Sequence, residues 1–340
     1  MTSSSSLTNQ REHLFRRLAL LTVITIYLLI LAGGIVRSTG SGMGCPDWPR
    51  CFGRWVPPTE VSQLPLNYQE IYGAKLKGEV EFNPVKTWIE YVNRLLGAFA
   101  GLLVFALLLV SIPYLKYDKR VFYWSLVSFV LIGLNGWLGS RVVATELAPY
   151  LVTFHMLLAI LVVFALLFVM AISFTGRVRV EPISQNTRVV NQILLWAMVL
   201  SVIQVLIGTQ VRESIDEVIQ RIGYSERYRW IDSLDFRFYI HRSFSLVILV
   251  FHLAVIYQLR KHTTTKGLLS QLITALIVMV VVEILSGIVL AYFAVPAAAQ
   301  PIHLTLAIVI LGLQFVALLV LNADQLLRNR AVQQPIYSKL

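Results

Sequence analysis

No charged residue interrupts residues 95–115, which read LLGAFAGLLVFALLLVSIPYL. A helix needs about 20 apolar residues to cross the hydrocarbon core of a bilayer, so this run is long enough to span one. Similar uncharged runs occupy 18–36, 121–140, 147–176 and 189–211. Two further apolar stretches cover 238–259 and 267–323, and Pro296 and Pro301 divide the second of them into two helices.

The sequence therefore predicts an all-α membrane protein with eight transmembrane helices. Their expected ranges are 18–37, 88–112, 121–140, 150–174, 190–211, 237–259, 268–293 and 301–322. The composition agrees, because 57% of the residues are hydrophobic and 14% are charged, whereas soluble domains carry about 25% charged residues. This composition excludes a soluble globular protein. Because the number of spanning helices is even, both termini are expected on the same side of the membrane.

The excess of basic residues, a formal net charge of +11, lies on one side of the membrane in this predicted topology. The two terminal segments and the connections at 113–120, 175–189 and 260–267 hold 15 basic and four acidic residues, whereas the opposite loops hold 12 of each. Short loops rich in Lys and Arg stay in the cytoplasm. We therefore predict cytoplasmic termini and outer loops at 38–87 and 212–236, and no nucleic-acid partner is needed to explain the basic charge.

The first apolar run is expected to be retained as a helix, not cleaved as a signal peptide. Its 19 uncharged residues exceed the usual hydrophobic region of a signal, and no Ala-x-Ala site follows. The residues before it include Glu12 and leave little room for an Arg-rich transit peptide. The expected location is a bacterial cytoplasmic membrane.

The second half of the chain repeats the first. The motif EYVNR at 90–94 aligns with FYIHR at 238–242, and FHMLLAI at 154–160 aligns with IHLTLAI at 302–308, both at a spacing of 148 residues. Arg37 aligns with Arg212 at a spacing of 175. We expect two parallel four-helix repeats, 1–175 and 176–340, related by an axis along the membrane normal.

Three histidines occupy repeat-related positions at the outer ends of helices: His155, His241 and His303. His241 and His303 enter the bilayer from the same side at similar depth, as two axial ligands of one haem iron would. The alternative is a set of interfacial histidines bonded to backbone or water. The repeat favours a haem or metal site.

Four arginines near the outer helix ends are candidate partners for haem propionates: Arg37, Arg94, Arg212 and Arg242. Arg94 and Arg242 are expected in the first turns of their helices, where the helix dipole disfavours a cation, so each needs a negative partner. The alternative is that these arginines snorkel to the interface.

The stretch VRSTGSGMGCPDWPRC at 36–51, the EYVNR motif and the three histidine motifs together resemble the haem A synthase family. The resemblance covers residues 18–322. It implies an eight-helix protein with two four-helix halves that oxidises a methyl group of haem O to a formyl group, giving haem A for terminal oxidases. A membrane electron carrier of cytochrome b type, with two permanent haems, is the alternative.

The resemblance also implies roles for individual residues. His241 and His303 match the ligands of a bound haem b, with Arg242 and Arg212 beside them. The substrate haem would lie by His155, Asn93, Arg94 and Arg37. Asn93 stands where the family more often has a histidine, so either His155 ligates alone or another residue completes the site.

Glu90 matches the acidic residue regarded as catalytic in this family. It lies three residues before Asn93 and so on nearly the same helix face. A carboxylate there could stabilise positive charge on the oxidised carbon and accept protons, and the alternative is a carboxylate favoured only by the helix dipole.

Cys45 and Cys51 are the only cysteines, and their expected outer location predicts a disulfide. One branch of the family has such a pair, which either stabilises the loop or passes reducing equivalents. Within the membrane, Glu283 either bonds inside the bundle or marks a proton or quinol route, and His252 is expected to pack or hydrogen-bond. Candidate partners are a haem O synthase, a quinone-type electron acceptor and membrane lipid, and an oligomer stays open.

Overall fold

The computed structural model describes residues 2–73, 81–174, 187–261, 263 and 267–327. Within these ranges the chain is helical and contains eight helices long and apolar enough to cross a membrane, as predicted. They are α1 (Thr2–Ser38), α3 (Pro84–Ser111), α4 (Lys119–Ala144), α5 (Pro149–Phe174), α6 (Arg188–Ile222), α7 (Phe236–Lys261), α8 (Leu268–Tyr292) and α9 (Ala299–Leu321). The short helices α2 (Tyr68–Tyr72) and α10 (Ala323–Leu326) lie outside the spanning set.

Local capping fixes several helix ends. The side chain of Asn83 accepts a hydrogen bond from the Lys86 N–H, and Pro84 supplies the first residue of α3. Asp118 caps α4 in the same way by accepting from the Arg120 N–H. At the end of α6, Gly223 has a φ of 79°, a conformation that glycine adopts without strain.

Two expectations about helix bounds were wrong. Residues 212–222, expected in an outer loop, continue α6, because Ile215 and Val218 on its inner face are buried with Trp230 in a small apolar cluster beyond the main core. The early starts of α3 and α7 also place Arg94 about three turns inside α3 and Arg242 in the second turn of α7, not in the first turns. The dipole argument for a negative partner therefore does not apply to these two arginines.

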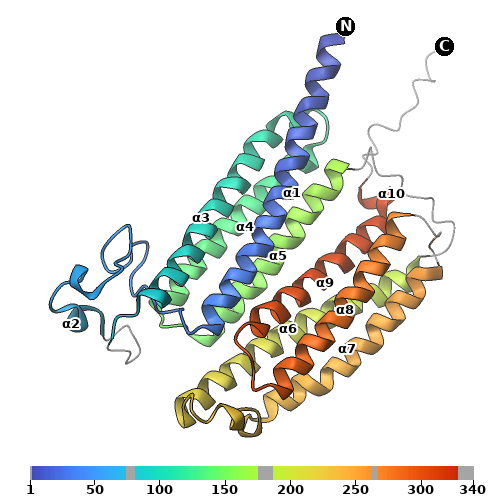
Figure 1. The fold of residues 1–340 in the computed structure, drawn as a ribbon. Coiled ribbons are helices and arrows are strands. Elements are labelled where there is room, and N and C mark those ends of the chain that lie inside the picture. Colours follow the sequence, from blue (N-terminus) through green and yellow to red (C-terminus); the bar gives the residue numbers. More distant parts are fainter. Residues whose placement is uncertain (1, 74–80, 175–186, 262, 264–266, 328–340) are drawn as a thin grey trace, which may run out of the picture.

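The eight helices form two groups of four (Figure 1). Helices α1, α3, α4 and α5 make one group, and α6 to α9 make the other. Helix α9 joins them by packing against α1, α5 and α6. The largest apolar cluster crosses this junction, since it combines Ala19 of α1, Leu166 of α5 and Leu311 of α9. The symmetry expected of the repeats stays a prediction.

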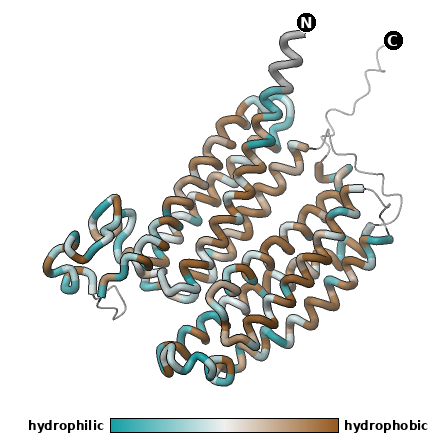
Figure 2. The backbone as a smooth tube through the Cα atoms, viewed as in Figure 1, coloured by the Kyte–Doolittle hydropathy of each residue, from teal (hydrophilic) through white to brown (hydrophobic). Residues whose placement is uncertain are grey.

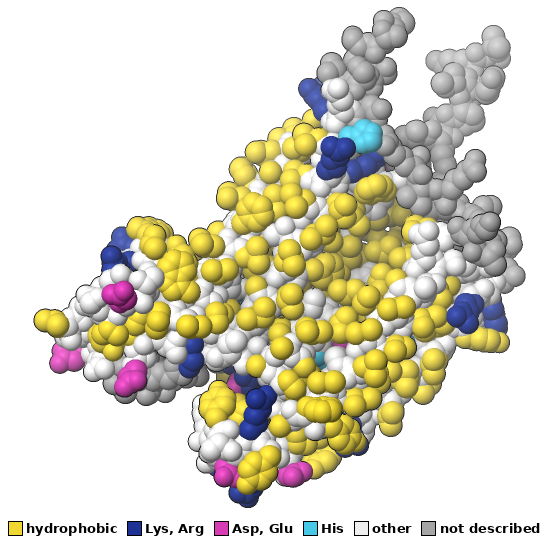
Figure 3. Space-filling model, viewed as in Figure 1, with side chains coloured by type: hydrophobic (Ala, Val, Ile, Leu, Met, Phe, Trp, Pro, Cys, Tyr) yellow, Lys and Arg dark blue, Asp and Glu magenta, His cyan; other side chains and the backbone are white. Residues whose placement is uncertain are grey.

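Hydropathy follows the helix axes (Figure 2). Apolar residues cover the middle of both groups, and hydrophilic ones gather at the two ends. In the space-filling view, coloured charges also lie toward these ends (Figure 3). The start of α1 and helix α10 lie at one end of the molecule, and the segment between α1 and α3 lies at the other. This arrangement is that of a chain crossing a membrane an even number of times.

Candidate functional site

His241 of α7 and His303 of α9 face each other in the second group of helices. Their ring centroids are 6.4 Å apart, with an interplanar angle of 72°. A histidine nitrogen lies about 2 Å from a metal ion that it binds, and the centroid of a five-membered ring lies about 1.2 Å behind that nitrogen. Two histidines on opposite sides of one metal therefore have centroids about 6.3 Å apart. The observed pair fits a single iron between two imidazoles.

Each of the three histidines packs against a glycine of the helix that precedes its own. A Cβ added to Gly139, Gly208 or Gly287 would lie 3.3 Å from the Cε1 atom of His155, His241 or His303, respectively. Such a contact is tight enough to push the ring aside. Glycine at these positions therefore lets the ring lie directly against the neighbouring helix.

A looser contact at a repeat-related position involves Asn93 of α3. A Cβ added to Gly33 of α1 would lie 4.0 Å from Asn93 Oδ1. Gly33 and Gly208 are 175 residues apart, the spacing that also relates Arg37 and Arg212. Gly33 and Gly208 were not among the predicted site residues, although this spacing could have pointed to them.

The ring nitrogens of the three histidines have different surroundings. Asn93 Oδ1 and His155 Nδ1 in the first half, and His241 Nδ1 in the second, are buried and have no hydrogen-bond partner among the described residues. In the second half, His303 Nδ1 lies 2.8 Å from Ser286 Oγ and 3.2 Å from Glu283 Oε1. Glu283 thus makes a contact inside the bundle, one of the two roles expected for it.

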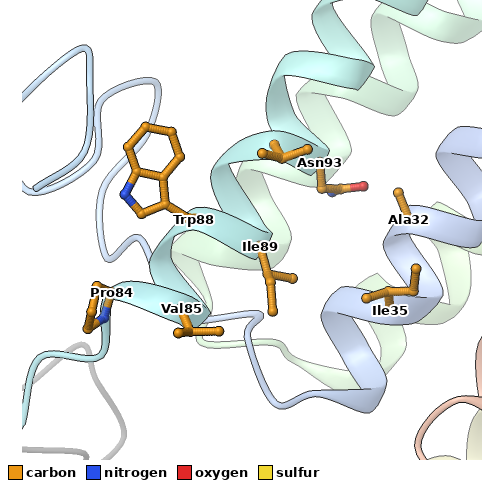
Figure 4. A pocket seen from close by; sticks show the side chains of 8 residues that line it. Ala32, Ile35, Pro84, Val85, Trp88, Ile89 and Asn93 are labelled. Atoms are coloured by element: carbon orange, nitrogen blue, oxygen red, sulfur yellow. The ribbon is translucent and has the colours of Figure 1, made fainter. Parts of the chain in front are cut away.

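A groove of about 550 Å³ lies between α1 and α3 and reaches Asn93 (Figure 4). Its lining is apolar apart from the Asn93 amide and the Trp88 indole nitrogen, and includes Ile35, Val85 and Ile89. Asn93 points toward α1 at one end of it. An apolar ligand could contact Asn93 through this groove.

Glu90 and Arg94 form a buried pair on α3. Glu90 is 3% exposed, and its Oε1 accepts hydrogen bonds from Arg94 Nε at 3.1 Å and Nη2 at 2.5 Å. Its Oε2 accepts from the Cys45 N–H at 2.8 Å. Arg94 also donates to the main-chain carbonyls of Cys45, Asp47 and Arg50 at 2.9, 2.7 and 3.0 Å. The pair therefore anchors the loop that precedes α3.

This loop, residues 44–55, is called the disulfide loop below, because Cys45 and Cys51 are bonded as predicted. Thr87 Oγ1 donates to the Gly44 carbonyl at 2.8 Å, and a Cβ on Gly44 would lie 2.5 Å from the Lys86 carbonyl oxygen. The Asp47 carboxylate accepts from the main-chain N–H groups of residues 52 and 53. Burial, with the charge of Asp47, raises the pKa of Tyr72 nearby.

The other three arginines expected near haem propionates have protein partners that were not predicted. They are Arg37, Arg212 and Arg242. Arg37 and Arg212 both pair with Asp216, Arg212 through Nη1 at 2.5 Å, and Arg212 Nη2 donates to the Arg37 carbonyl at 3.1 Å. Asp216 follows Arg212 by four residues, a spacing that could have predicted the pair. Arg242 is exposed and lies 3.5 Å from the Tyr292 hydroxyl.

His252 lies deeper in α7, where its Nδ1 is 2.8 Å from the Ile248 carbonyl and its Nε2 is 3.1 Å from Gln314 Nε2. It is 3% exposed, so its expected packing and hydrogen-bonding role is confirmed.

The fold is that of an integral membrane protein, and His241 and His303 form a candidate ligand pair near one end of its helices. The family model described as cytochrome oxidase assembly protein, COX15-CtaA, matches residues 16–315. Because this match covers most of the chain, the protein belongs to the COX15-CtaA family.

Several curated relatives carry the name heme A synthase. The chain is 24% identical to the one from Bartonella tribocorum over 315 residues, which are 83% of this chain and 85% of the relative. It is 30% identical to the one from Shewanella oneidensis over 137 residues, which are 40% of this chain and 39% of the relative. The match to the Ehrlichia canis protein, at 29% identity, covers 55% of this chain and 56% of that protein.

Proposed function

We propose that this protein is a haem A synthase, an oxidoreductase that converts haem O to haem A for terminal oxidases. The observation that carries the proposal is the difference between the halves. One half has two histidines spaced for a single iron, and the other has one histidine, His155, and the amide of Asn93. A resident cofactor needs firm ligation, whereas a substrate has to enter and leave. The names of the relatives support this assignment.

In this proposal, His241 and His303 hold a haem b, with Arg212 and Arg242 on the side of its propionates. The 6.4 Å centroid spacing supports this ligand pair. A bound haem supplies one-electron redox chemistry, and the protein sets its orientation and potential. The adjacent glycines allow both rings to lie against their neighbouring helices.

The first half would bind haem O through His155, with Asn93 beside the groove between α1 and α3. Arg37 and Arg94 lie toward the same end of the helices. Their contacts with Asp216 and with the disulfide loop support a further role in fixing that end of the site. An amide is a poor iron ligand, so His155 is the protein ligand in this proposal.

Glu90 is the proposed catalytic carboxylate. Its two oxygens are held by Arg94 and the Cys45 N–H, which fixes the carboxylate one helical turn from Asn93. A fixed negative charge stabilises positive charge that develops on an oxidised methyl carbon, and the same group can accept a proton. A haem O synthase and a quinone-type electron acceptor are the proposed partners, in a bacterial cytoplasmic membrane with cytoplasmic termini.

The test is expression with a source of haem O, followed by chromatography of the extracted pigments. We expect haem A from the unchanged protein, and from Glu90→Gln a normal haem content with little or no haem A. If the unchanged protein binds haem but yields neither haem A nor any hydroxylated intermediate, the proposed enzymatic activity is rejected. The electron-carrier alternative would then account for the haem.

A further inference from the structure

A pocket of about 400 Å³ lies between the disulfide loop and the end of α4. The loop lies at the end of the first group of helices where α4 finishes (Figure 1). Asp47 and Trp48 line the pocket from the loop, and Ser140, Arg141 and Glu146 line it from α4 and the turn that follows. We propose that this pocket binds the headgroup of one phospholipid that carries both a phosphate and a primary ammonium, phosphatidylethanolamine. This inference does not depend on the proposed haem sites.

The pocket holds charges of both signs. Arg141 and Glu146 are exposed, and neither side chain has a hydrogen-bond or ion-pair partner among the residues that the structure describes. The Asp47 carboxylate accepts from the main-chain N–H groups of residues 52 and 53 and keeps its negative charge. A purely anionic ligand would face two carboxylates, and a purely cationic one would leave Arg141 unpaired. A zwitterion places a group of opposite sign against each.

Each part of the headgroup has a matching side chain in the pocket. The Arg141 guanidinium can bind a phosphate through two parallel N–H···O bonds. A primary ammonium has three donors, and acceptors are present on Asp47, Glu146 and Ser140. The Ser140 hydroxyl donates to a main-chain carbonyl of its own helix, so its oxygen is left to accept. Trp48 is 54% exposed and offers an indole face to a cation.

The pocket lies at the depth of the lipid headgroups. Arg141 follows Lys119, the first residue of α4, by 22 positions, which is about 33 Å along a helix axis. The hydrocarbon core of a bilayer is about 30 Å thick. Trp137, one turn before Arg141, is 61% exposed, and exposed tryptophans are typical of the membrane interface. A phospholipid whose chains lie along α4 therefore brings its headgroup to this pocket.

The walls of the pocket are held in place by contacts within the protein. The Asp47 carbonyl accepts from Arg94 Nη1 at 2.7 Å. In the turn after α4, Glu146 and Leu147 have φ angles of 54° and 65°, and the Leu147 N–H donates to a carbonyl of the last turn of the helix at 2.8 Å. A Cβ added to Gly42 would lie 3.1 Å from Leu147, so this turn packs against the segment after α1. A preformed pocket loses less free energy to ordering when its ligand binds.

The second half has the same turn without the charges. Residues 294–295 repeat the positive φ angles of Glu146 and the residue after it. At the spacing of 148 residues, Val289 stands at the position of Arg141. At the same spacing, Ala294 stands at the position of Glu146. The backbone of the turn therefore does not require the charged residues, which favours a role for them in binding.

The test measures the binding of single lipids to the purified full-length protein in detergent by native mass spectrometry. Three phospholipids with identical acyl chains are compared: phosphatidylethanolamine, phosphatidylcholine and phosphatidylglycerol. We expect one molecule of phosphatidylethanolamine to bind at least tenfold more tightly than either of the others. The choline headgroup has no N–H donor, and the glycerol headgroup has no cation.

Substitutions locate this binding in the pocket. Arg141→Gln should weaken phosphatidylethanolamine binding about tenfold, because it removes charged hydrogen bonds to the phosphate. Glu146→Gln should remove the preference over phosphatidylglycerol. Arg229→Gln is the matched control, since it changes an arginine with a 59% exposed side chain in the loop between α6 and α7. It should bind all three lipids as the unchanged protein does.

Equal binding of the three lipids, or equal binding of phosphatidylethanolamine by Arg141→Gln and the unchanged protein, would overturn the proposal. Tighter binding of phosphatidylglycerol would also overturn it, because the pocket would then be an anion site. If Arg141→Gln does not accumulate, Glu146→Gln decides alone, and a retained preference over phosphatidylglycerol overturns the proposal. Haem A production does not enter the test, so failure of the proposed function leaves its outcome unchanged.

Discussion

Replacing Arg94 by alanine is expected to release the disulfide loop from α3. The guanidinium donates to three main-chain carbonyls of this loop and to Glu90, and its side chain is 13% exposed. At about 1.5 kcal/mol each, the low end of the range for charged donors, three such bonds contribute about 4.5 kcal/mol. That is roughly a two-thousandfold change in the equilibrium between the closed and the open loop. Glu90 would also be left buried without its cation, which adds to the cost.

The Cys45–Cys51 disulfide reports this opening. Both cysteines are at most 1% exposed, so a reductant reaches the sulfur atoms only after the loop has moved. The assay follows reduction by dithiothreitol in the purified protein, with the freed thiols trapped by a maleimide that changes gel mobility. When opening and closing are fast, the reduction rate follows the open population.

Thr87→Val is the matched control, because it removes one hydrogen bond, to the Gly44 carbonyl. Its expected effect is about 1 kcal/mol, or about fivefold. If Arg94→Ala is reduced no faster than Thr87→Val, the loop contacts of Arg94 contribute little and the reasoning fails. Loss of haem in Arg94→Ala without faster reduction would instead favour the propionate role.

Three further predictions concern the helices. Asn93→His should give a low-spin, bis-histidine absorption spectrum for haem bound in the first half, and an unchanged spectrum would place Asn93 away from the iron. Gly287→Ala should weaken haem retention about tenfold, because its Cβ would lie 3.3 Å from His303 Cε1, whereas Gly136→Ala, with nothing within 4 Å, should not. Asp216→Asn should lower the free energy of unfolding by about 2 kcal/mol, since the pairs it breaks are partly exposed, and an unchanged thermal midpoint in detergent would contradict this.

The helices could be predicted because membrane spans are marked by uncharged runs of sufficient length. The bounds were less certain, because caps and packing extend a helix beyond its apolar run. Asn83 and Pro84 start α3 before its apolar residues begin. Apolar packing of Ile215 and Val218 extends α6 beyond the charged Arg212.

The site was only partly predictable for a related reason. The repeat placed His241 and His303 at similar depth on two helices of the same half, and their observed spacing agrees with binding of one iron between them. The acceptors of Arg94 could not be predicted, because they are main-chain carbonyls, which every residue type carries. The Arg212–Asp216 pair follows from a local spacing of four residues, but Arg37 shares this carboxylate only because of how the two groups of helices meet.

The glycine contacts fix the position of a side chain near each proposed haem site but do not fix which residue type stands there. Gly33, Gly139, Gly208 and Gly287 each lie against one side chain of a neighbouring helix, three times a histidine and once Asn93. In the proposed haem sites, replacing the side chain that faces the glycine would change the iron ligand and leave the glycine in place. A protein engineer could therefore add or remove a proposed metal ligand at position 93, 155, 241 or 303 by a single substitution. The backbone around that position would need no redesign.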